Sequence, residues 1–207
     1  MQTVNPQNVT ELSAIMRILG NLYYRHPSSQ ELSGLYDLIK TGKLYDSWPI
    51  EQAELFKRLE KHPLTEIAKA YDDLFNERLS LRLTPELSEK YQTLTIEQIK
   101  EIVATIDMPV TETTDYAHYG FHWLILAWIE TTLYHKQSEE VEDERVEELQ
   151  ELMNCVFSEL IEPFSLGILG KIEAYTDHDF YKVVAMITRE VIVEINIILT
   201  ELEQENS

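Results

Sequence analysis

The sequence has 207 residues, a formal net charge of −20 and a single cysteine, Cys155. A chain of this length can bury a core of its own, and one cysteine leaves it without an internal disulfide. Its 37 acidic residues against 17 basic ones disfavour nucleic acid and anionic lipid as direct partners and favour a basic partner.

Six glycines, seven prolines and the lack of alternating β-branched segments indicate an all-α protein. We expect one compact domain over residues 1–207 with about eight to ten helices. Within it, a helical part over 1–76 and a second over 95–207 flank a loop or hinge over 77–94.

The first half of the chain predicts four helices. The first begins at Asn8, whose side chain can cap it, and ends near His26, before Pro27. Three more follow, separated by glycine and proline, over about 29–41, 50–61 and 64–76. From residue 77 to 94 the apolar periodicity is weak, and a long loop in a compact domain is more often functional than idle.

The second half begins with a capping box of Thr95 and Gln98, which opens a helix to about residue 106. A helix over 114–136 follows, then one that includes residues 146–160 and breaks or kinks at Pro163 before continuing over 164–175. The last helix carries a full-length apolar stripe of Phe180, Val184, Ile187, Val191, Ile195, Ile198 and Leu202.

The helix from residue 114 carries Asp115, His118 and His122 at helical spacing, which suits metal chelation from one face. A catalytic H-E-x-x-H motif is absent, so a hydrogen-bonded core histidine or a peptide contact is favoured over a metal site. The sequence also lacks a G-x-S-x-G elbow and a glycine-rich phosphate loop. We therefore expect a protein that is not an enzyme, and no cofactor.

Aromatic and apolar residues flank the irregular segments and could line a groove for a peptide. Leu74, Phe75 and Trp123 are equally well explained as plain core, because aromatic residues at helical spacing usually are. The candidate groove residues are Tyr71, Leu74, Phe75, Pro85 and the segment from His118 to Trp123.

Four blocks of the sequence resemble the TorD/DmsD family of cytoplasmic redox-enzyme maturation chaperones. In chain order they are RILGNLYYRHPSSQEL, YDDLFNERLSLRLTPELSEKY, AHYGFHWLILAWIE and LIEPFSLGILGKIEAYTDHDFY. The chain departs from the family pattern in two places. Ala117 stands where the family has its signature aspartate, with Asp115 two residues earlier, and Glu86 replaces an aromatic residue after the loop proline.

The resemblance implies a TorD-like helical chaperone that binds the twin-arginine signal peptide of a molybdopterin-containing oxidoreductase of the DMSO or TMAO reductase type. Such a chaperone holds back export until the cofactor is inserted. It further implies that peptide-binding residues fall on Tyr71, Leu74, Phe75, Pro85, Ser88 and His118, with Asp115 as the replacement carboxylate.

Such a receptor needs carboxylates beside an apolar groove, and this sequence offers both. The amino-terminal segment has no basic n-region and no apolar h-region, and the longest apolar run, 121–129, is shorter than the roughly 20 residues that cross a bilayer. We expect a cytoplasmic protein without membrane insertion.

Two alternatives stay open: a metal-dependent helical enzyme that uses Asp115, His118 and His122, and a structural protein that dimerises through its acidic helices. Whether the chain is a monomer or a domain-swapped homodimer is also open.

Overall fold

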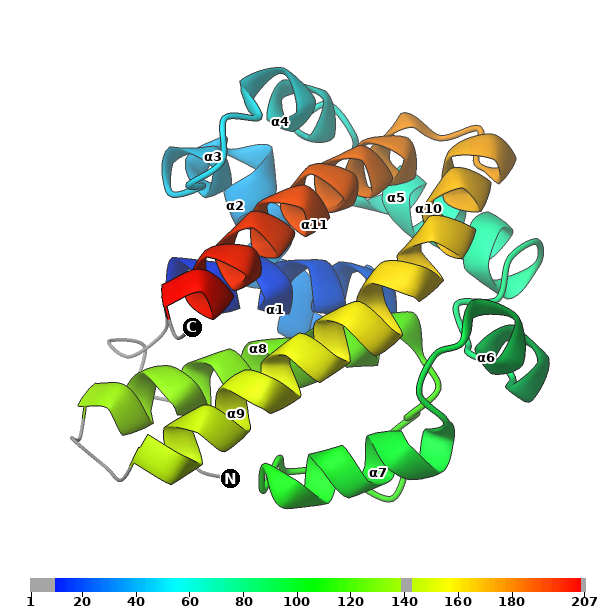
Figure 1. Cartoon of the computed structure of the whole chain (residues 1–207). Helices are drawn as coiled ribbons and strands as arrows, with labels where there is room; N and C mark the ends of the chain where they lie inside the picture. Colours follow the sequence, from blue (N-terminus) through cyan, green and yellow to red (C-terminus); the bar gives the residue numbers. More distant parts are fainter. Residues whose placement is uncertain (1–9, 139–142, 206–207) are drawn as a thin grey trace. The chain divides into compact units, whose positions relative to one another are not determined.

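The computed structural model describes residues 10–138 and 143–205, which form helices joined by turns and short extended segments (Figure 1). In chain order the elements are α1 Glu11–Tyr24, η2 Gln30–Leu32, α2 Ser33–Lys40, α3 Lys43–Asp46, α4 Ala53–Leu59, α5 Leu64–Tyr71, η3 Asp72–Asn76, α6 Pro85–Tyr91, α7 Ile96–Thr105, α8 Tyr119–Ser138, α9 Asp143–Val156, η4 Phe157–Ile161, α10 Glu162–Tyr175 and α11 Asp179–Glu205. Within the described ranges, β pairing is limited to one isolated bridge between Arg82 and His118.

The all-α prediction is confirmed. In the described residues α9, η4 and α10 form one continuous helix. Counted in this way, the elements α1 to α11 make ten helices. The predicted helix over 64–76 coincides with α5 and η3, and the capping box of Thr95 and Gln98 is present at the start of α7. The predicted cap Asn8 lies outside the described residues.

Three predicted boundaries need correction. The loop predicted over 77–94 contains helix α6, and α3 was not predicted at all. Both helices are too short to show an apolar stripe, which is why periodicity misses them. The helix expected from residue 114 begins at Tyr119 instead, because residues 111–118 form turns held by side-chain and backbone hydrogen bonds.

The chain divides into two compact units. Unit 1 comprises Met1–Tyr24 and Arg82–Phe164, and unit 2 comprises Arg25–Leu81 and Ser165–Ser207. These boundaries differ from the predicted parts 1–76, 77–94 and 95–207, because α1 packs on α8 and is grouped with it.

Unit 1 is built on the close packing of α1 against α8. Two glycines allow this approach: a Cβ added to Gly120 would lie 2.5 Å from the backbone nitrogen of Tyr24 and 2.6 Å from the backbone oxygen of Gly20. Helix α9 contacts α8 as well. The side chain of Trp123 on α8 is fully buried, as the core alternative predicted.

The sequence predicted a break or a kink at Pro163, and there is no break, since the helix continues through this residue as α10. Proline has no N–H, so the carbonyl of Glu159, four residues earlier, loses its usual α-helical donor. The backbone N–H of Leu94 donates to that carbonyl instead, at 3.1 Å. The π-helical segment η4 ends at Ile161, two residues before the proline, and such a segment absorbs an irregularity in a helix.

Unit 2 is organised around α11, which contacts α4 and α5. In its predicted apolar stripe Phe180, Val184, Ile187, Val191 and Ile195 are buried and Ile198 is partly exposed, whereas the side chain of Leu202 lies outside the described part of the chain. At its amino-terminal end Arg58 of α4 donates two hydrogen bonds to the Asp179 carboxylate, at 2.5 and 3.0 Å.

One helical stretch among the described residues, Glu144–Tyr175, is long and apolar enough to cross a membrane by composition alone. Half of the qualifying window is buried inside the protein, and the core helix of a soluble protein meets the same criteria. The stretch is therefore weak evidence for a membrane span.

Candidate functional site

The seven residues predicted to bind a peptide fall into both units. Pro85, Ser88, Asp115 and His118 belong to unit 1, whereas Tyr71, Leu74 and Phe75 belong to unit 2. We describe the two sets separately.

Pro85 and Ser88 line a cavity of about 480 Å³ in unit 1, which we call the α6–α7 cavity. Two carboxylates, those of Glu89 and Glu97, also line it, and none of the lining residues is lysine or arginine. The complete lining is Leu83, Thr84, Pro85, Ser88, Glu89, Gln92, Thr93, Thr95, Ile96 and Glu97. The cavity thus combines apolar surface with negative charge.

Helix α6, which forms one side of this cavity, is fixed by its own sequence. The Thr84 hydroxyl accepts a hydrogen bond from the backbone N–H of Leu87, and Pro85 occupies the first turn, where its missing N–H costs nothing. At the other end the buried Ser88 hydroxyl donates toward the carbonyls of Thr93 and Leu94, at 3.0 and 3.2 Å. Ser88 therefore lines the cavity while its hydroxyl holds the turn after α6.

The segment that leads into α6 pairs with the segment that leads into α8. The backbone N–H of Leu83 donates to the carbonyl of Ala117 at 2.8 Å, beside the bridge between Arg82 and His118. The Arg82 guanidinium also donates to the Asp115 carboxylate at 2.6 Å. Asp115, the predicted replacement for the family aspartate, is thus paired with an arginine of the same chain.

His118 is held at the start of α8 as a neutral hydrogen-bond acceptor. Its Nδ1 accepts from the backbone N–H of Gly120 at 3.1 Å, and its ring lies edge-on to Tyr24, with 5.1 Å between centroids. Burial lowers the pKa of His118 to about 4, with Asp115 opposing the shift and Arg82 adding to it. Near pH 7 the imidazole is therefore uncharged, and its proton lies on Nε2.

The metal alternative at Asp115, His118 and His122 finds no support in the geometry. His122 is fully buried, and its Nε2 lies 3.0 Å from the carbonyl of Tyr116, to which it donates. Asp115 is engaged by Arg82, and these three residues do not form a group of metal-ligating atoms in the described part of the chain. His122 is instead a hydrogen-bonded core histidine, the reading that the sequence favoured.

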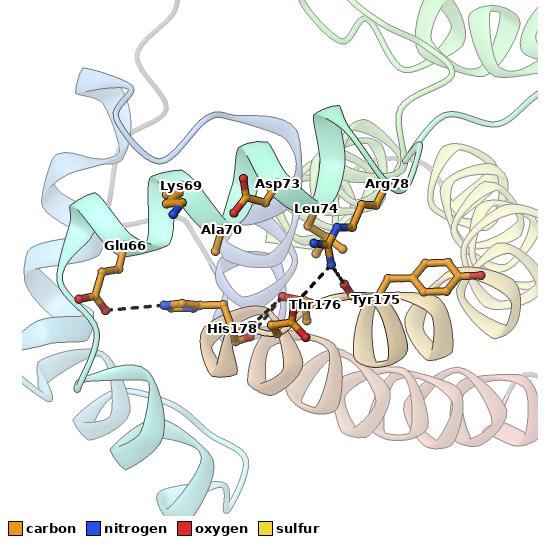
Figure 2. A pocket seen from close by; sticks show the side chains of 10 residues that line it. Glu66, Lys69, Ala70, Asp73, Leu74, Arg78, Tyr175, Thr176 and His178 are labelled. Atoms are coloured by element: carbon orange, nitrogen blue, oxygen red, sulfur yellow. Dashed lines mark hydrogen bonds and ion pairs between the residues drawn. The ribbon is translucent and has the colours of Figure 1, made fainter.

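In unit 2 the predicted residues belong to an aromatic cluster. Tyr71 and Leu74 are buried, and only Phe75 is partly exposed. The Phe75 ring lies 5.0 Å from that of Tyr71 and 5.1 Å from that of Tyr181, in edge-on contacts. Leu74 also borders a second cavity, of about 310 Å³, which we call the α5 cavity (Figure 2).

Several residues that shape these sites were not singled out from the sequence. Glu89 and Glu97 are inconspicuous in so acidic a chain, and Arg82 lies 33 positions from the carboxylate that it binds. Thr84 followed by Pro85 is a recognisable helix start and would have revealed α6.

An all-helical chain whose cavity presents carboxylates beside apolar side chains has the chemistry of a protein that binds basic, partly apolar ligands. The sequence is 31% identical over 199 residues to the chaperone protein YcdY of Escherichia coli (strain K12), a match that spans 96% of this chain and 99% of that relative. No family model matches the sequence. The chain therefore belongs to the family of this chaperone.

Proposed function

We propose that this chaperone acts in the cytoplasm on the twin-arginine signal peptide of a molybdopterin-containing oxidoreductase of the DMSO or TMAO reductase type. By holding the peptide it delays export until cofactor insertion and folding are complete. The peptide's arginines bind to the carboxylates of Glu89 and Glu97, and its apolar segment binds to the apolar part of the α6–α7 cavity.

The α6–α7 cavity is the observation that supports this proposal. A twin-arginine signal carries two guanidinium groups beside an apolar segment, so its receptor needs acceptors next to apolar surface. The cavity holds two carboxylates with Leu83, Pro85 and Ile96, and no lysine or arginine lines it. The net charge of −20 favours the encounter with a basic peptide.

The ligand is tested by titrating the full-length protein into a fluorescently labelled synthetic peptide that carries two consecutive arginines and an apolar segment. A matched peptide with two lysines keeps the charge but loses the planar fork that binds a carboxylate through two hydrogen bonds. We expect the lysine peptide to bind at least about tenfold more weakly, which corresponds to about 1.4 kcal/mol. Equal affinities, or no binding of either peptide, would overturn the choice of ligand.

The location is tested by the double variant Glu89→Gln with Glu97→Gln. Its control is Glu147→Gln with Glu151→Gln, which removes the same charge from exposed positions on α9. We expect the cavity variant to bind the arginine peptide about tenfold more weakly and the control to bind nearly as the wild type does. If both variants keep wild-type affinity while the wild type binds the peptide, the binding site lies elsewhere.

Phe75 and His118 provide a separate test of the predicted contacts outside the cavity. We expect Phe75→Ala to weaken peptide binding while the melting temperature changes little. We expect His118→Ala to weaken binding with some loss of stability, because the His118 Nδ1 accepts from the Gly120 backbone N–H. If Phe75 only packs the aromatic cluster, its truncation costs about 3–5 kcal/mol of stability instead. Wild-type affinity in both variants would remove these two residues from the site.

The cargo class itself is tested by a pull-down from the native cytoplasm. We expect the pull-down to recover an unexported protein with a twin-arginine leader.

A further inference from the structure

Three potential metal ligands meet beside the α5 cavity in unit 2. One ligand atom each from His62, Glu66 and His178 lies within 4.8 Å of the other two. His62 lies two residues before α5, Glu66 lies in the first turn of that helix, and His178 directly precedes α11. Figure 2 shows the Glu66 and His178 side chains directed toward one another. Two imidazoles and a carboxylate form the ligand set of many zinc sites with an open coordination position.

Each imidazole has a buried Nε2 atom, and that of His178 faces the Glu66 carboxylate. The Nε2 atoms of His62 and His178 are shielded from solvent and make no hydrogen bond with the described residues. The two rings lie side by side, with 4.5 Å between their centroids, and the His178 Nε2 is 3.9 Å from the Glu66 carboxylate. That distance is too long for a hydrogen bond but suits two atoms on either side of an ion.

The spacing is close to what a bound ion requires. In tetrahedral zinc coordination, metal-to-ligand distances of about 2.0–2.1 Å place neighbouring ligand atoms roughly 3.3 Å apart. The three atoms here must therefore approach one another by about 1.5 Å at most. Glu66 is exposed and free to make that movement. Glu66 and His178 both line the α5 cavity of about 310 Å³, so a water molecule has room to complete the coordination.

Metal binding at this position has one local cost. The His178 Nδ1 accepts a weak hydrogen bond of 3.3 Å from the backbone N–H of Phe180, which leaves the ring proton on Nε2. A metal ion at Nε2 displaces that proton to Nδ1, so the bond to Phe180 is lost. Burial and the neighbouring His62 lower the pKa of His178, whereas Glu66 and Asp179 oppose the shift. Neutral imidazole is the form that binds metals.

We propose that His62, Glu66 and His178 bind a divalent transition-metal ion of the zinc type. Mixed imidazole and carboxylate ligands favour such ions over Mg²⁺ and Ca²⁺, which prefer oxygen ligands alone. The site shares no residue with the lining of the α6–α7 cavity, so each can be tested by its own variants.

The experiment measures Co²⁺ and Zn²⁺ binding to the full chain after treatment with a chelator. Cobalt reports its geometry through its visible absorption, and zinc is then added to displace it. We expect one equivalent of Co²⁺ with a tetrahedral spectrum, displaced by Zn²⁺ but not by excess Mg²⁺. The variants His62→Ala and Glu66→Gln should lose this equivalent. The exposed Glu66 makes its variant the safer one for folding, which circular dichroism checks.

The matched control is His26→Ala, because His26 pairs with the Asp72 carboxylate in the same unit but lies outside the cluster. We expect this variant to keep the full equivalent. A chain with 37 acidic residues binds cations adventitiously, and such binding would be equally strong in all variants. If His62→Ala and Glu66→Gln fold and retain the cobalt spectrum and stoichiometry of the wild type, or if the wild type binds no Co²⁺ or Zn²⁺, the proposal is wrong.

Discussion

At the scale of single residues, His122 shows how burial fixes a protonation state. The side chain is fully buried, and burial lowers its pKa from 6.5 to about 4, while its hydrogen bond to Tyr116 opposes the shift. The unfolded chain therefore takes up a proton near pH 6.5, whereas the folded chain does so only near pH 4. The contribution of this group to stability is complete above pH 6.5 and is lost as the pH falls toward 4.

We expect His122→Gln to be less sensitive to acid than the wild type. The glutamine amide can still donate to the Tyr116 carbonyl, but it takes up no proton. This lowering of the pKa corresponds to about 3 kcal/mol. Between pH 6.5 and 4 the wild type should therefore lose about 3 kcal/mol more of its free energy of unfolding than the variant does. Urea denaturation at a series of pH values measures the difference. Parallel curves for the two proteins would show that His122 is protonated equally in both states.

The residue scale also shows what sequence patterns leave out. The pattern around His118 favoured a role other than metal binding at Asp115, His118 and His122, because the H-E-x-x-H motif is absent. It gave no sign that Arg82 pairs with Asp115, since that contact depends on how the segments before α6 and α8 lie together. In the same way, His62 and Glu66 are close in the sequence, but His178 joins them only through the fold.

At the scale of elements, capping residues at a helix start are informative even where a helix is too short to show apolar periodicity. The helix start at Thr95 was correct because four residues encode it, with hydrogen bonds in both directions between Thr95 and Gln98. Helix α6 was missed because a helix of seven residues shows little periodicity, although Thr84 and Pro85 mark its start. Pro163 did not break its helix, because the carbonyl that it leaves free accepts from Leu94, a partner that the sequence does not reveal.

Gly120 gives a prediction at this scale, because it sets the distance between α1 and α8. The added Cβ of Gly120→Ala would meet the backbone of Tyr24 and Gly20 at 2.5 and 2.6 Å, so the two helices must separate. We expect a loss of at least about 1–3 kcal/mol in the free energy of unfolding, together with a changed environment for His118, whose ring contacts Tyr24. Thermal or urea denaturation measures the loss.

Gly34→Ala is the control for that substitution. Gly34 also lies in a helix, but a Cβ added there meets no atom within 4 Å. Alanine is favoured over glycine in a helix interior by roughly 0.5–1 kcal/mol, so this variant should be slightly more stable than the wild type. A Gly120→Ala protein as stable as Gly34→Ala would mean that the close approach of α1 and α8 is not required.

At the scale of the whole molecule, the composition predicted the fold class, but it did not predict which segments pack into each of the two units. Few glycines and helical apolar spacing suffice to indicate an all-α protein. The grouping of α1 with residues 82–164 depends on packing between α1 and α8, which are distant in the sequence. The predicted peptide-binding residues consequently fall into both units, although we predicted from the sequence that they line one groove.

The net charge of −20 predicts how salt changes the binding of a twin-arginine peptide. Exposed charges act over a screening length of about 10 Å at 0.1 M salt and about 3 Å at 1 M. Added salt should therefore lower the association rate, which long-range attraction governs, and change the dissociation rate much less. Stopped-flow fluorescence with the labelled arginine peptide measures both rates.

Two charge variants separate the field of the whole molecule from local contacts. Glu147→Gln with Glu151→Gln removes two exposed negative charges away from the cavity, so it should slow association slightly and leave dissociation unchanged. Glu89→Gln with Glu97→Gln removes the same charge from the lining of the α6–α7 cavity. This variant should mainly speed dissociation, because the lost hydrogen bonds act only in the formed complex. If the two variants change both rates alike, the peptide is held by the overall field of the protein and not by the carboxylates of the cavity.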